Sequence, residues 1–384
     1  MKKRLEDIAL IGAGQGAPQG ADSYCDNGTP FVKAGNLQEL IEGIDINEIQ
    51  KVSEEVAGKH KLKIYPRGTI LFAKSGMSCM KGYVYVLPRE AYVVSHLACV
   101  SPIDDMSEYL KYYFKYHRPN KLVKDAAYPS ISLSDIGGLE VDIKNDHERE
   151  DIVRRLNLIE SIVSLRKKEI DALDNLIKAR FVELFGDPIE NPRGWDYVTV
   201  GDLVTEVRYG TSSPAVDGGQ YPYLRMNNLT YDGHIDLSDL KYIDISDDEK
   251  EKCVVRRGDV LFNRTNSVEL VGKTAVFDLP KEMIIAGYII RVRLGERMLP
   301  DVFSQYMNLK ALKDILKSMA KGAVNQANIN AQELQSIKIY VPDMQLQKEF
   351  IEIKEQVDKS KAVIQKSLDE TQVLFDSLMQ QYFG

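Results

Sequence analysis

The sequence predicts an α+β protein with two tandem strand-rich domains, each followed by a long helix. Two observations support this fold class: an uninterrupted heptad pattern near the middle of the chain, and a two-fold internal repeat that spans nearly all of it. A chain of 384 residues is also long enough for two domains of ordinary size. We expect the two long helices to pair as an antiparallel coiled coil, which would give the chain a pseudo-two-fold axis.

The central helix is predicted over residues 147–186. No proline or glycine interrupts it before Gly186, and Pro188 follows as a stop signal. At 1.5 Å per residue, such a helix would be a rod of roughly 58 Å. Its apolar heptad positions are Ile152, Leu156, Ile159, Val163, Ile170, Leu173, Ile177 and Leu184. Arg166 and Arg180 occupy the two heptad positions that are not apolar.

The C-terminal helix, predicted over residues 343–384, repeats this pattern less regularly. Two unrelated amphipathic helices, each packed on its own domain, are the alternative. A strict heptad seam is narrower than the usual core-facing stripe, so it favours pairing between the helices. The predicted pairing positions in this second helix are Phe350, Val357, Ile364, Leu368, Phe375, Leu378 and Tyr382.

The internal repeat sets the domain boundaries. Residues 29–37 resemble residues 221–229, and residues 128–143 resemble residues 326–341. The offset between the copies is 192 at Thr29, 190 at Pro66 and 198 from Ile131 onward, so the second copy contains a net insertion. The predicted boundaries are 1–146 for the first domain, 147–186 for the central helix, 187–342 for the second domain and 343–384 for the C-terminal helix.

Composition excludes several classes of protein. No apolar run approaches the length of a membrane span, and the N-terminus makes a poor signal peptide. The four cysteines form no C-x-x-C pair, which suggests a reduced cytoplasm with neither a disulfide framework nor a zinc site. A net charge of −7 argues against general polyanion binding, so DNA binding would need local basic loops and help from a partner.

One motif resembles a dinucleotide-binding fingerprint. Residues 8–17 match G-x-G-x-x-A after an apolar run, but Pro18 and Gly20 follow where a helix would have to begin. The equivalent stretch of the second copy, residues 207–214, has no such glycine pattern. The five histidines show no metal-ligand or triad spacing, and neither a phosphate-binding loop nor G-x-S-x-G occurs. The sequence therefore predicts no catalytic residue.

Side chains suited to nucleic-acid recognition gather at the ends of the predicted strands. Arg and Lys can bind guanine, Asn and Gln can bind adenine, and Ser or Thr can bind phosphates. Ordinary turn chemistry is the alternative for any single loop, and the recurrence of such loops in two aligned copies favours recognition. The candidates in the second domain are Tyr209, Thr211, Ser212, Arg225, Asn227, Asn228, Asn263, Arg264, Asn266, Lys321, Asn325, Gln326 and Asn328. Those in the first domain are Gln15, Gln19, Lys33, Asn36, Lys74, Ser75, Ser78, Tyr128 and Ser130.

The order of these boxes resembles the DNA specificity subunit of type I restriction–modification systems. The resemblance covers the chain from about residue 4 to 384. It is carried by the Arg-Gly-x-Ile/Val-Leu-Phe boxes at 67–72 and 257–262, the Pro-x-x-Lys/Arg-x-x-Asn-Leu boxes at 30–37 and 222–229, and the helix end at 173–186. The first domain departs from the family pattern at 128–131 and at Ala73-Lys74.

The resemblance implies a non-catalytic subunit that recognises a bipartite site on double-stranded DNA. The rod would set the spacer between the half-sites, and the helices would dock two methyltransferase subunits. Those subunits, and not this chain, would bind S-adenosylmethionine and flip the target adenine. A restriction and translocation subunit could join the complex. Two other functions stay open at this point: a coiled-coil scaffold that binds proteins without recognising DNA, and a self-sufficient enzyme, which the missing motifs disfavour.

Overall fold

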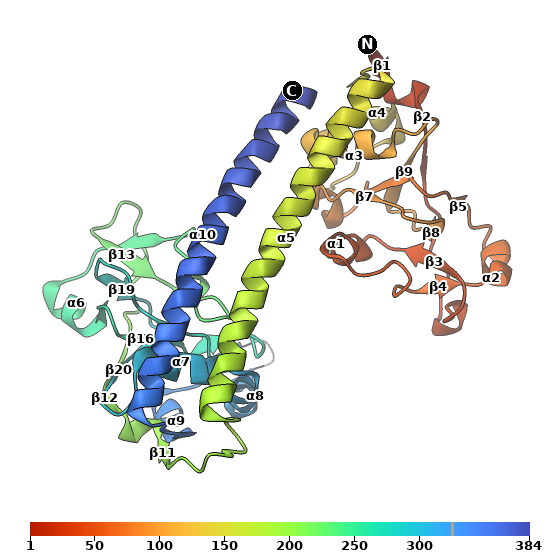
Figure 1. The fold of residues 1–384 in the computed structure, drawn as a ribbon. Helices are drawn as coiled ribbons and strands as arrows, with labels where there is room; N and C mark the ends of the chain where they lie inside the picture. The colour runs from red at the N-terminus through yellow and green to blue at the C-terminus, as the bar shows by residue number, and fades with distance from the viewer. Residues whose placement is uncertain (324–325) are drawn as a thin grey trace. The chain divides into compact units, whose positions relative to one another are not determined.

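The computed structural model describes residues 1–323 and 326–384, with side chains outside 321–326. The described chain divides into two compact units (Figure 1). Unit 1 comprises Met1–Arg166 and Lys366–Gly384, and unit 2 comprises Lys167–Gln365. Each unit therefore contains one of the two predicted strand-rich domains together with a part of each long helix.

Unit 1 is built on two four-stranded sheets. The first sheet is antiparallel throughout, whereas in the second sheet the two central strands run parallel. The first has the order β2 (Ala9–Ala13), β9 (Leu97–Pro102), β6 (Ile70–Ala73) and β7 (Tyr85–Val86); the second has the order β4 (Lys51–Val52), β3 (Thr29–Val32), β8 (Ala91–Val93) and β5 (Ile64–Tyr65). A separate pair joins β1 (Lys2–Arg4) to β10 (Glu140–Asp142), and the short helices are α1 (Asn36–Glu42), α2 (Glu54–Lys59), α3 (Ser107–Tyr116) and α4 (Leu133–Gly137).

Unit 2 contains the same two sheets in the same strand order. The first has the order β12 (Val204–Tyr209), β20 (Ile289–Leu294), β16 (Val260–Asn263) and β18 (Thr274–Val276); the second has the order β14 (Lys241–Ile243), β13 (Tyr221–Leu224), β19 (Met283–Ile285) and β15 (Val254–Val255). The outer pair is β11 (Tyr197–Thr199) with β23 (Lys338–Tyr340), and the short helices are α6 (Asp247–Cys253), α7 (Pro300–Asn308), α8 (Lys310–Met319) and α9 (Ala331–Ser336).

The matching strand orders confirm the α+β fold and the internal repeat. Ile70 pairs with Val100 in unit 1, just as Val260 pairs with Val292 in unit 2. The second copy also contains α8 and a small sheet of β17 (Thr265–Asn266), β22 (Gln326–Asn328) and β21 (Lys321–Ala323). In unit 1 this small sheet is reduced to a single bridge between Ser75 and Ser130.

Strand β6 and its equivalent β16 are inner strands of the first sheet of each unit. All four residues of each strand are buried. Side chains on both faces are covered, which explains why Ile70–Ala73 and Val260–Phe262 are continuous apolar runs rather than alternating ones. The core of unit 1 then extends to α3, where Phe72 packs on Phe114 with the ring centroids 5.0 Å apart.

The two long helices are α5 (Asp146–Phe185) and α10 (Met344–Phe383), each of 40 residues (Figure 1). In unit 2 the Phe350 ring centroid lies 5.6 Å from that of Phe185, and Lys361 forms an ion pair with Asp174. Eleven residues forward on α10 (361 − 350) correspond to eleven residues backward on α5 (185 − 174), so the helices run antiparallel. No helix among the described residues has the length and apolar character needed to cross a bilayer.

The seam between the helices differs from the predicted one at the C-terminal end of each helix. Phe181 and Phe185 are fully buried, whereas Leu184 is half-buried and Arg180 is exposed and bonded to Glu183. The helix end must face α7 as well as its partner helix: the Phe181 ring lies 5.9 Å from that of Tyr306. The apolar face is therefore wider there than a strict heptad seam.

The same shift occurs on α10 in unit 1. Met379 and Phe383 are buried, whereas the predicted Leu378 and Tyr382 are half-buried. Phe383 lies 5.2 Å from the ring of Tyr109 in α3. Of the other predicted positions, Ile152, Leu156, Ile159, Ile177, Phe350 and Val357 are buried, and Val163, Ile170, Leu173, Ile364, Leu368 and Phe375 are half-buried.

The glycine motif of the first strand has a purely structural explanation. A Cβ on Gly14 would lie 1.9 Å from the carbonyl oxygen of Val93, and one on Gly210 would lie 2.2 Å from that of Ile285. Two chain segments therefore approach too closely at this point for any side chain. The next helical turn, Ala21–Ser23, has only three residues, so no helix follows the glycines as a dinucleotide site would require.

The close approach at Gly14 can be tested by substitution. Gly14→Ala should lower the free energy of unfolding by about 1–3 kcal/mol, because the new methyl group collides with backbone atoms that cannot move independently. Gly16→Ala is the matched control, since a Cβ there would meet nothing within 4 Å. Urea unfolding of both variants measures the difference, and equal stability of the two would contradict the steric explanation.

Candidate nucleic-acid interface

Three of the predicted loops in unit 2, and one turn that was not predicted, meet around one cavity of about 560 Å³. They are the segment after β12, the turn after β13, the residue that follows β16, and the β19–β20 turn. Side chains with hydrogen-bonding groups line the cavity together with Met226, Pro214 and Ala286. The structure thus brings together loops that lie far apart in the sequence. The polar lining residues are Thr211, Ser212, Ser213, Tyr223, Arg225, Asn227, Arg264 and Tyr288.

Arg264 is the most suitable recognition group in this cavity. Its guanidinium carbon lies 4.9 Å from the centroid of the Tyr209 ring, and the Tyr209 hydroxyl accepts a hydrogen bond of 2.8 Å from the Ala331 amide. Nη1 donates a long hydrogen bond of 3.5 Å to the Gly287 carbonyl, and Nε has no hydrogen-bond partner. The cation is therefore oriented by an aromatic ring while it is held by no carboxylate among the described residues.

Arg225 also lines the cavity and is more strongly engaged than Arg264. Its Nη2 donates 2.6 Å to the carboxylate of Asp239 and 3.1 Å to the Asp239 carbonyl. This hydrogen bond lowers the pKa of Asp239 below its usual range, with the nearby Lys241 adding to the effect. Part of the Arg225 charge is consequently compensated within the domain, and Arg264 is better placed to bind an external acceptor.

Three of the predicted recognition residues are buried and take part in internal hydrogen bonds instead. Thr211 donates to Glu249 and accepts 3.0 Å from the Ser213 amide. Asn263 donates 3.1 Å to each of the carbonyls of Thr265 and Tyr288. We revise the prediction for Thr211, Asn228 and Asn263: all three are less than 5% exposed and shape the loops rather than face a ligand.

The asparagine in the repeated Pro-x-x-Lys/Arg-x-x-Asn-Leu box is one of these loop-shaping residues. The Asn228 side-chain oxygen accepts 2.8 Å from the Arg225 amide, and Asn36 accepts 2.9 Å from the Lys33 amide in unit 1. Both asparagines close the same turn, which is a common use of the residue. The recurrence that suggested recognition thus has a structural cause at this position, and the prediction for Asn36 is revised with that for Asn228.

Some of the remaining candidates of unit 2 are exposed, and others are hydrogen-bonded to buried residues of the loops. Ser212 and Asn227 are exposed at the rim of the cavity. Asn266 donates 2.9 Å to Asn263, and Asn328 accepts 3.4 Å from Thr265, so both belong to the supporting network. The candidates Lys321, Asn325 and Gln326 lie outside the residues whose side chains the structure describes.

Unit 1 repeats the backbone arrangement around Arg264 with a different cation. The Lys74 amide donates 2.9 Å to the His96 carbonyl, as Arg264 does to Tyr288 at 2.9 Å. The Lys74 carbonyl accepts from Ile131 at 2.8 Å, as Arg264 does from Ile329 at 2.9 Å. Lys74 is therefore the structural equivalent of Arg264.

The other candidates of unit 1 are less concentrated. Ser75 is hydrogen-bonded to the His96 ring at 2.8 Å. The Lys33 ammonium donates to Gln50 and lies 4.4 Å from the Tyr24 ring centroid. The Gln15 side chain accepts a hydrogen bond from the Lys63 amide, and the Gln19 side chain donates one to the Ala17 carbonyl. Ser78 is half-buried, whereas Tyr128 and Ser130 are exposed.

Two residues beside these sites were missing from the sequence prediction. His96 is exposed and lies next to Lys74 in unit 1, and Tyr288 is exposed and lies next to Arg264 in unit 2. They occupy equivalent turns of the two units. The strands on either side align the two residues, because β8 and β19 begin 192 residues apart, as do β9 and β20. The residue types differ, histidine in one copy and tyrosine in the other, so the correspondence is not evident from the residues themselves.

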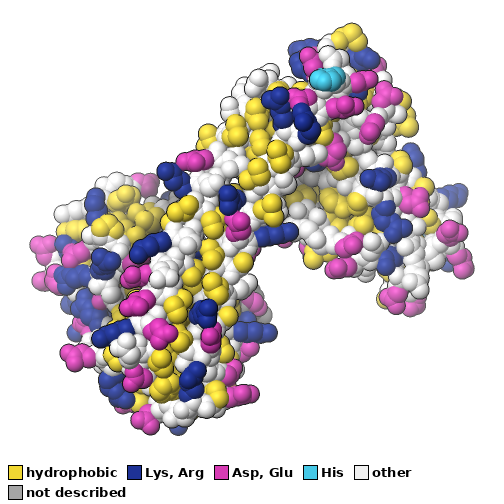
Figure 2. Space-filling model, in the orientation of Figure 1, with side chains coloured by type: hydrophobic (Ala, Val, Ile, Leu, Met, Phe, Trp, Pro, Cys, Tyr) yellow, Lys and Arg dark blue, Asp and Glu magenta, His cyan; other side chains and the backbone are white. Residues whose placement is uncertain are grey.

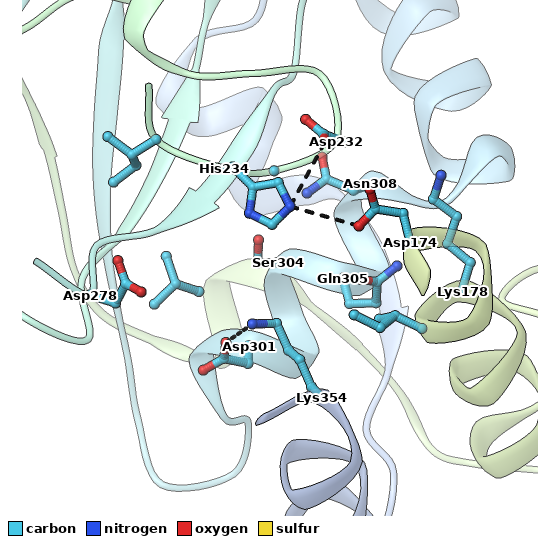
Figure 3. A pocket seen from close by; sticks show the side chains of 14 residues that line it. Asp174, Lys178, Asp232, His234, Asp278, Asp301, Ser304, Gln305, Asn308 and Lys354 are labelled. Atoms are coloured by element: carbon cyan, nitrogen blue, oxygen red, sulfur yellow. Dashed lines mark ion pairs between the residues drawn. The ribbon is translucent and has the colours of Figure 1, made fainter. Parts of the chain in front are cut away.

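A second polar cluster in unit 2 joins Asp174, Asp232 and His234 beside a cavity of about 90 Å³. His234 points between the two carboxylates, with Nε2 3.9 Å from Asp174 and 3.8 Å from Asp232 (Figure 3). Three such groups could hold a metal, but the Lys361 ammonium contacts both Asp174 and His234. That ammonium supplies the positive charge, so the cluster is an internal ion-pair network.

Burial would by itself raise the pKa of Asp174, but hydrogen bonds from His234 and Lys361 lower it below its usual range. The carboxylate is therefore ionised at neutral pH, as the ion pair with Lys361 requires. The network connects α5, α10 and the loop that contains Asp232, and it holds that loop against both helices.

Comparison with known proteins identifies relatives along the whole chain. A family model described as the type I restriction modification DNA specificity domain matches residues 1–175 and 192–371. The type I restriction enzyme EcoKI specificity subunit of Escherichia coli is 21% identical over 378 residues, which cover 92% of this chain and 81% of that protein.

Two relatives come from Methanocaldococcus jannaschii. The MjaIX specificity subunit is 22% identical over 62% of this chain and 60% of its own length. A provisionally assigned MjaX specificity subunit is 30% identical over 47% of this chain and 43% of its own length. The alignments therefore span about half the length of these two relatives.

Solved structures share the fold. A type I restriction–modification S subunit from M. genitalium matches all of this chain and 96% of its own length, with a TM-score of 0.56 and 16% identity. A chain from a structure concerned with complex assembly and conformational transition of the type I system matches with a TM-score of 0.57 at the same identity. At this level of identity the likeness concerns the fold alone.

The supporting role assigned to the buried asparagines can be tested on Asn263. Asn263→Ala should lower the free energy of unfolding by about 1–3 kcal/mol, because the buried Thr265 carbonyl loses its donor and the Tyr288 carbonyl keeps only the Arg264 amide. Asn227→Ala, at the exposed rim, should change stability by no more than about 0.5 kcal/mol. If Asn263→Ala kept full stability and lost only DNA binding, the original prediction of direct recognition would be correct.

Proposed function

The chain is a DNA specificity subunit of the type I restriction–modification family, and from that premise we propose that each unit recognises one half of a bipartite double-stranded DNA site. One observation carries the proposal. The same backbone frame occurs twice and holds a cation at the same strand end, Arg264 in unit 2 and Lys74 in unit 1. A repeated frame with different side chains is what recognition of two different half-sites requires.

Arg264 would make the most specific contact. A guanidinium can donate two parallel hydrogen bonds to O6 and N7 of guanine in the major groove, and no other base pair presents that pair of acceptors there. Stacking on Tyr209 fixes the plane of the guanidinium before DNA arrives, so little side-chain entropy is lost on binding. Lys74 carries a point charge without this planar geometry and would contact phosphate or a guanine acceptor less selectively.

The chemistry would belong to partner subunits. The sequence contains none of the catalytic motifs considered above, and we propose that this chain binds no cofactor and that S-adenosylmethionine is held by methyltransferase subunits. The net charge of −7 is consistent with a complex in which the partner subunits provide most of the phosphate contacts. A restriction and translocation subunit would be a further, optional member of the complex.

Exposed apolar side chains on the long helices support the docking of two identical partners. Leu165 and Val363 are 59% and 70% exposed, and Leu176 and Leu374 are 40% and 52% exposed. Each pair occupies equivalent positions of the two helices (363 − 165 = 374 − 176 = 198). Figure 2 shows such hydrophobic side chains at the surface of both helices. Unit 1 thus carries Leu165 and Leu374, and unit 2 carries Leu176 and Val363, one apolar pair for each methyltransferase copy.

A scaffold that binds proteins without recognising DNA is the alternative function. The same apolar helix positions would suit it. It gives no reason, however, for an arginine stacked on tyrosine at an exposed cavity in unit 2. A footprint of the chain with its methyltransferase partners on genomic DNA separates the two functions, because a scaffold would protect no defined sequence.

Recognition by Arg264 predicts a selective loss of affinity. In complex with the methyltransferase, Arg264→Ala should weaken binding to the cognate site by about 1–3 kcal/mol while binding to random DNA is nearly unchanged. Arg208→Ala is the matched control, since Arg208 is an exposed arginine that is paired with Glu206. Competition binding at fixed salt measures both. An equal loss on cognate and random DNA would make Arg264 a phosphate contact.

The docking surfaces predict a change in stoichiometry. Leu374→Glu should leave one methyltransferase copy bound, and Leu374→Glu combined with Val363→Glu should leave none, because a buried carboxylate without a partner opposes docking. Leu10→Glu is the control, since Leu10 is equally exposed but lies in β2. Native mass spectrometry counts the subunits. Retention of two copies by the double variant would place the docking surface elsewhere.

A further inference from the structure

The turn that joins the second sheet to the first has the same backbone geometry in both units. In unit 1 it spans residues 94–97, with the Leu97 amide bonded to the Val94 carbonyl at 3.0 Å; in unit 2 it spans 286–289, with Ile289 bonded to Ala286 at 2.8 Å. The amide of the second residue of each turn donates 2.7 Å to the segment that follows β2 or β12, from Ser95 to Gln15 and from Gly287 to Thr211. Each turn is thus bonded to a neighbouring segment as well as within itself.

The third residue of this turn, His96 or Tyr288, is held by its backbone while its side chain is exposed. Its carbonyl accepts the amide of Lys74 in unit 1 and of Arg264 in unit 2, at 2.9 Å in each case. The residue after it is fully buried in both units. A ring at this position is therefore placed accurately by the frame, and the fold gains little from it, since the Tyr288 side chain is 50% exposed.

The two rings differ in chemistry and in how they are oriented. The His96 Nδ1 is hydrogen-bonded to the Ser75 hydroxyl at 2.8 Å, which fixes the ring plane and directs Nε2 away from that contact. In unit 2 the equivalent of Ser75 is Thr265, which is buried and bonded to Asn328, so the Tyr288 ring has no such tether. Tyr288 instead lines the cavity beside Arg264.

We propose that His96 and Tyr288 are the specificity-determining residues at equivalent points of the two half-site readers. This inference rests on the proposed function. Each ring lies next to a cation at a strand end, where the cation can bind a phosphate or guanine and the ring can contact the adjacent base edge. His96 offers one imidazole nitrogen at a fixed orientation, and Tyr288 offers a phenol hydroxyl together with a stacking face. The two half-sites would consequently differ in sequence, and each ring would influence only its own half.

Selection of bound DNA from a randomised library, with the chain in complex with its methyltransferase subunits, tests the inference. His96→Ala should reduce the preference for the cognate base at one or two positions of one half-site by about five-fold or more, and Tyr288→Ala should do the same in the other half only. Tyr288→Phe keeps the ring and removes the hydroxyl, so it should relax preference less. His60→Ala and Tyr242→Ala, exposed residues outside these turns, are the matched controls.

The possible outcomes separate this inference from the function on which it rests. If the unsubstituted complex selects no sequence, the proposed function fails. If it selects a split site and both variants keep its preferences unchanged, the proposed function stands and the inference is overturned. A uniform loss of affinity for all sequences, or relaxation of both half-sites by one variant, would also overturn it. Unchanged thermal unfolding of the variants confirms that the frame is intact.

Discussion

The packing of the two long helices against both domain cores is the constraint on which the structure depends. In unit 2, Phe350 at the start of α10 contacts Phe181 and Phe185 at the end of α5, and Phe181 contacts Tyr306 of the domain. In unit 1, Met379 and Phe383 at the end of α10 belong to the same core as the first strands. The first domain is therefore completed only by the last residues of the chain, which makes long-range contacts a condition of its folding.

Duplication gives both domains one frame and leaves their surfaces free to differ. The close approach at Gly14 and Gly210, the asparagine-closed turns at Asn36 and Asn228, and the strand order are the same in the two units. These features use backbone atoms and buried polar groups, which tolerate little change. Side chains that point outward from the same strand ends carry no such restriction, so a lysine in one unit can stand where an arginine stands in the other.

Two charged groups of unit 2 are paired with an opposite charge inside the unit, which clarifies their roles. Lys361 neutralises Asp174 beside His234, and Asp239 engages Arg225. Arg264 differs because an aromatic ring holds it in place of a carboxylate. Because a guanidinium held in this way keeps its charge and most of its donors, Arg264 is the group in this cavity best suited to an external acceptor.

The sequence by itself determined the repeat, the two long helices, the strand-rich domains and three of the segments that meet at the cavity. These features follow from local periodicity and from the similarity of two stretches of one chain. Only the tertiary structure decided which polar side chains face outward: Thr211, Asn228 and Asn263 proved to be buried, and His96 and Tyr288 proved to be exposed beside the cations. It also moved the helix seam from Leu184 to Phe181 and Phe185. The reason is physical, because burial depends on which distant segments cover a residue, and a pattern along the chain does not contain that information.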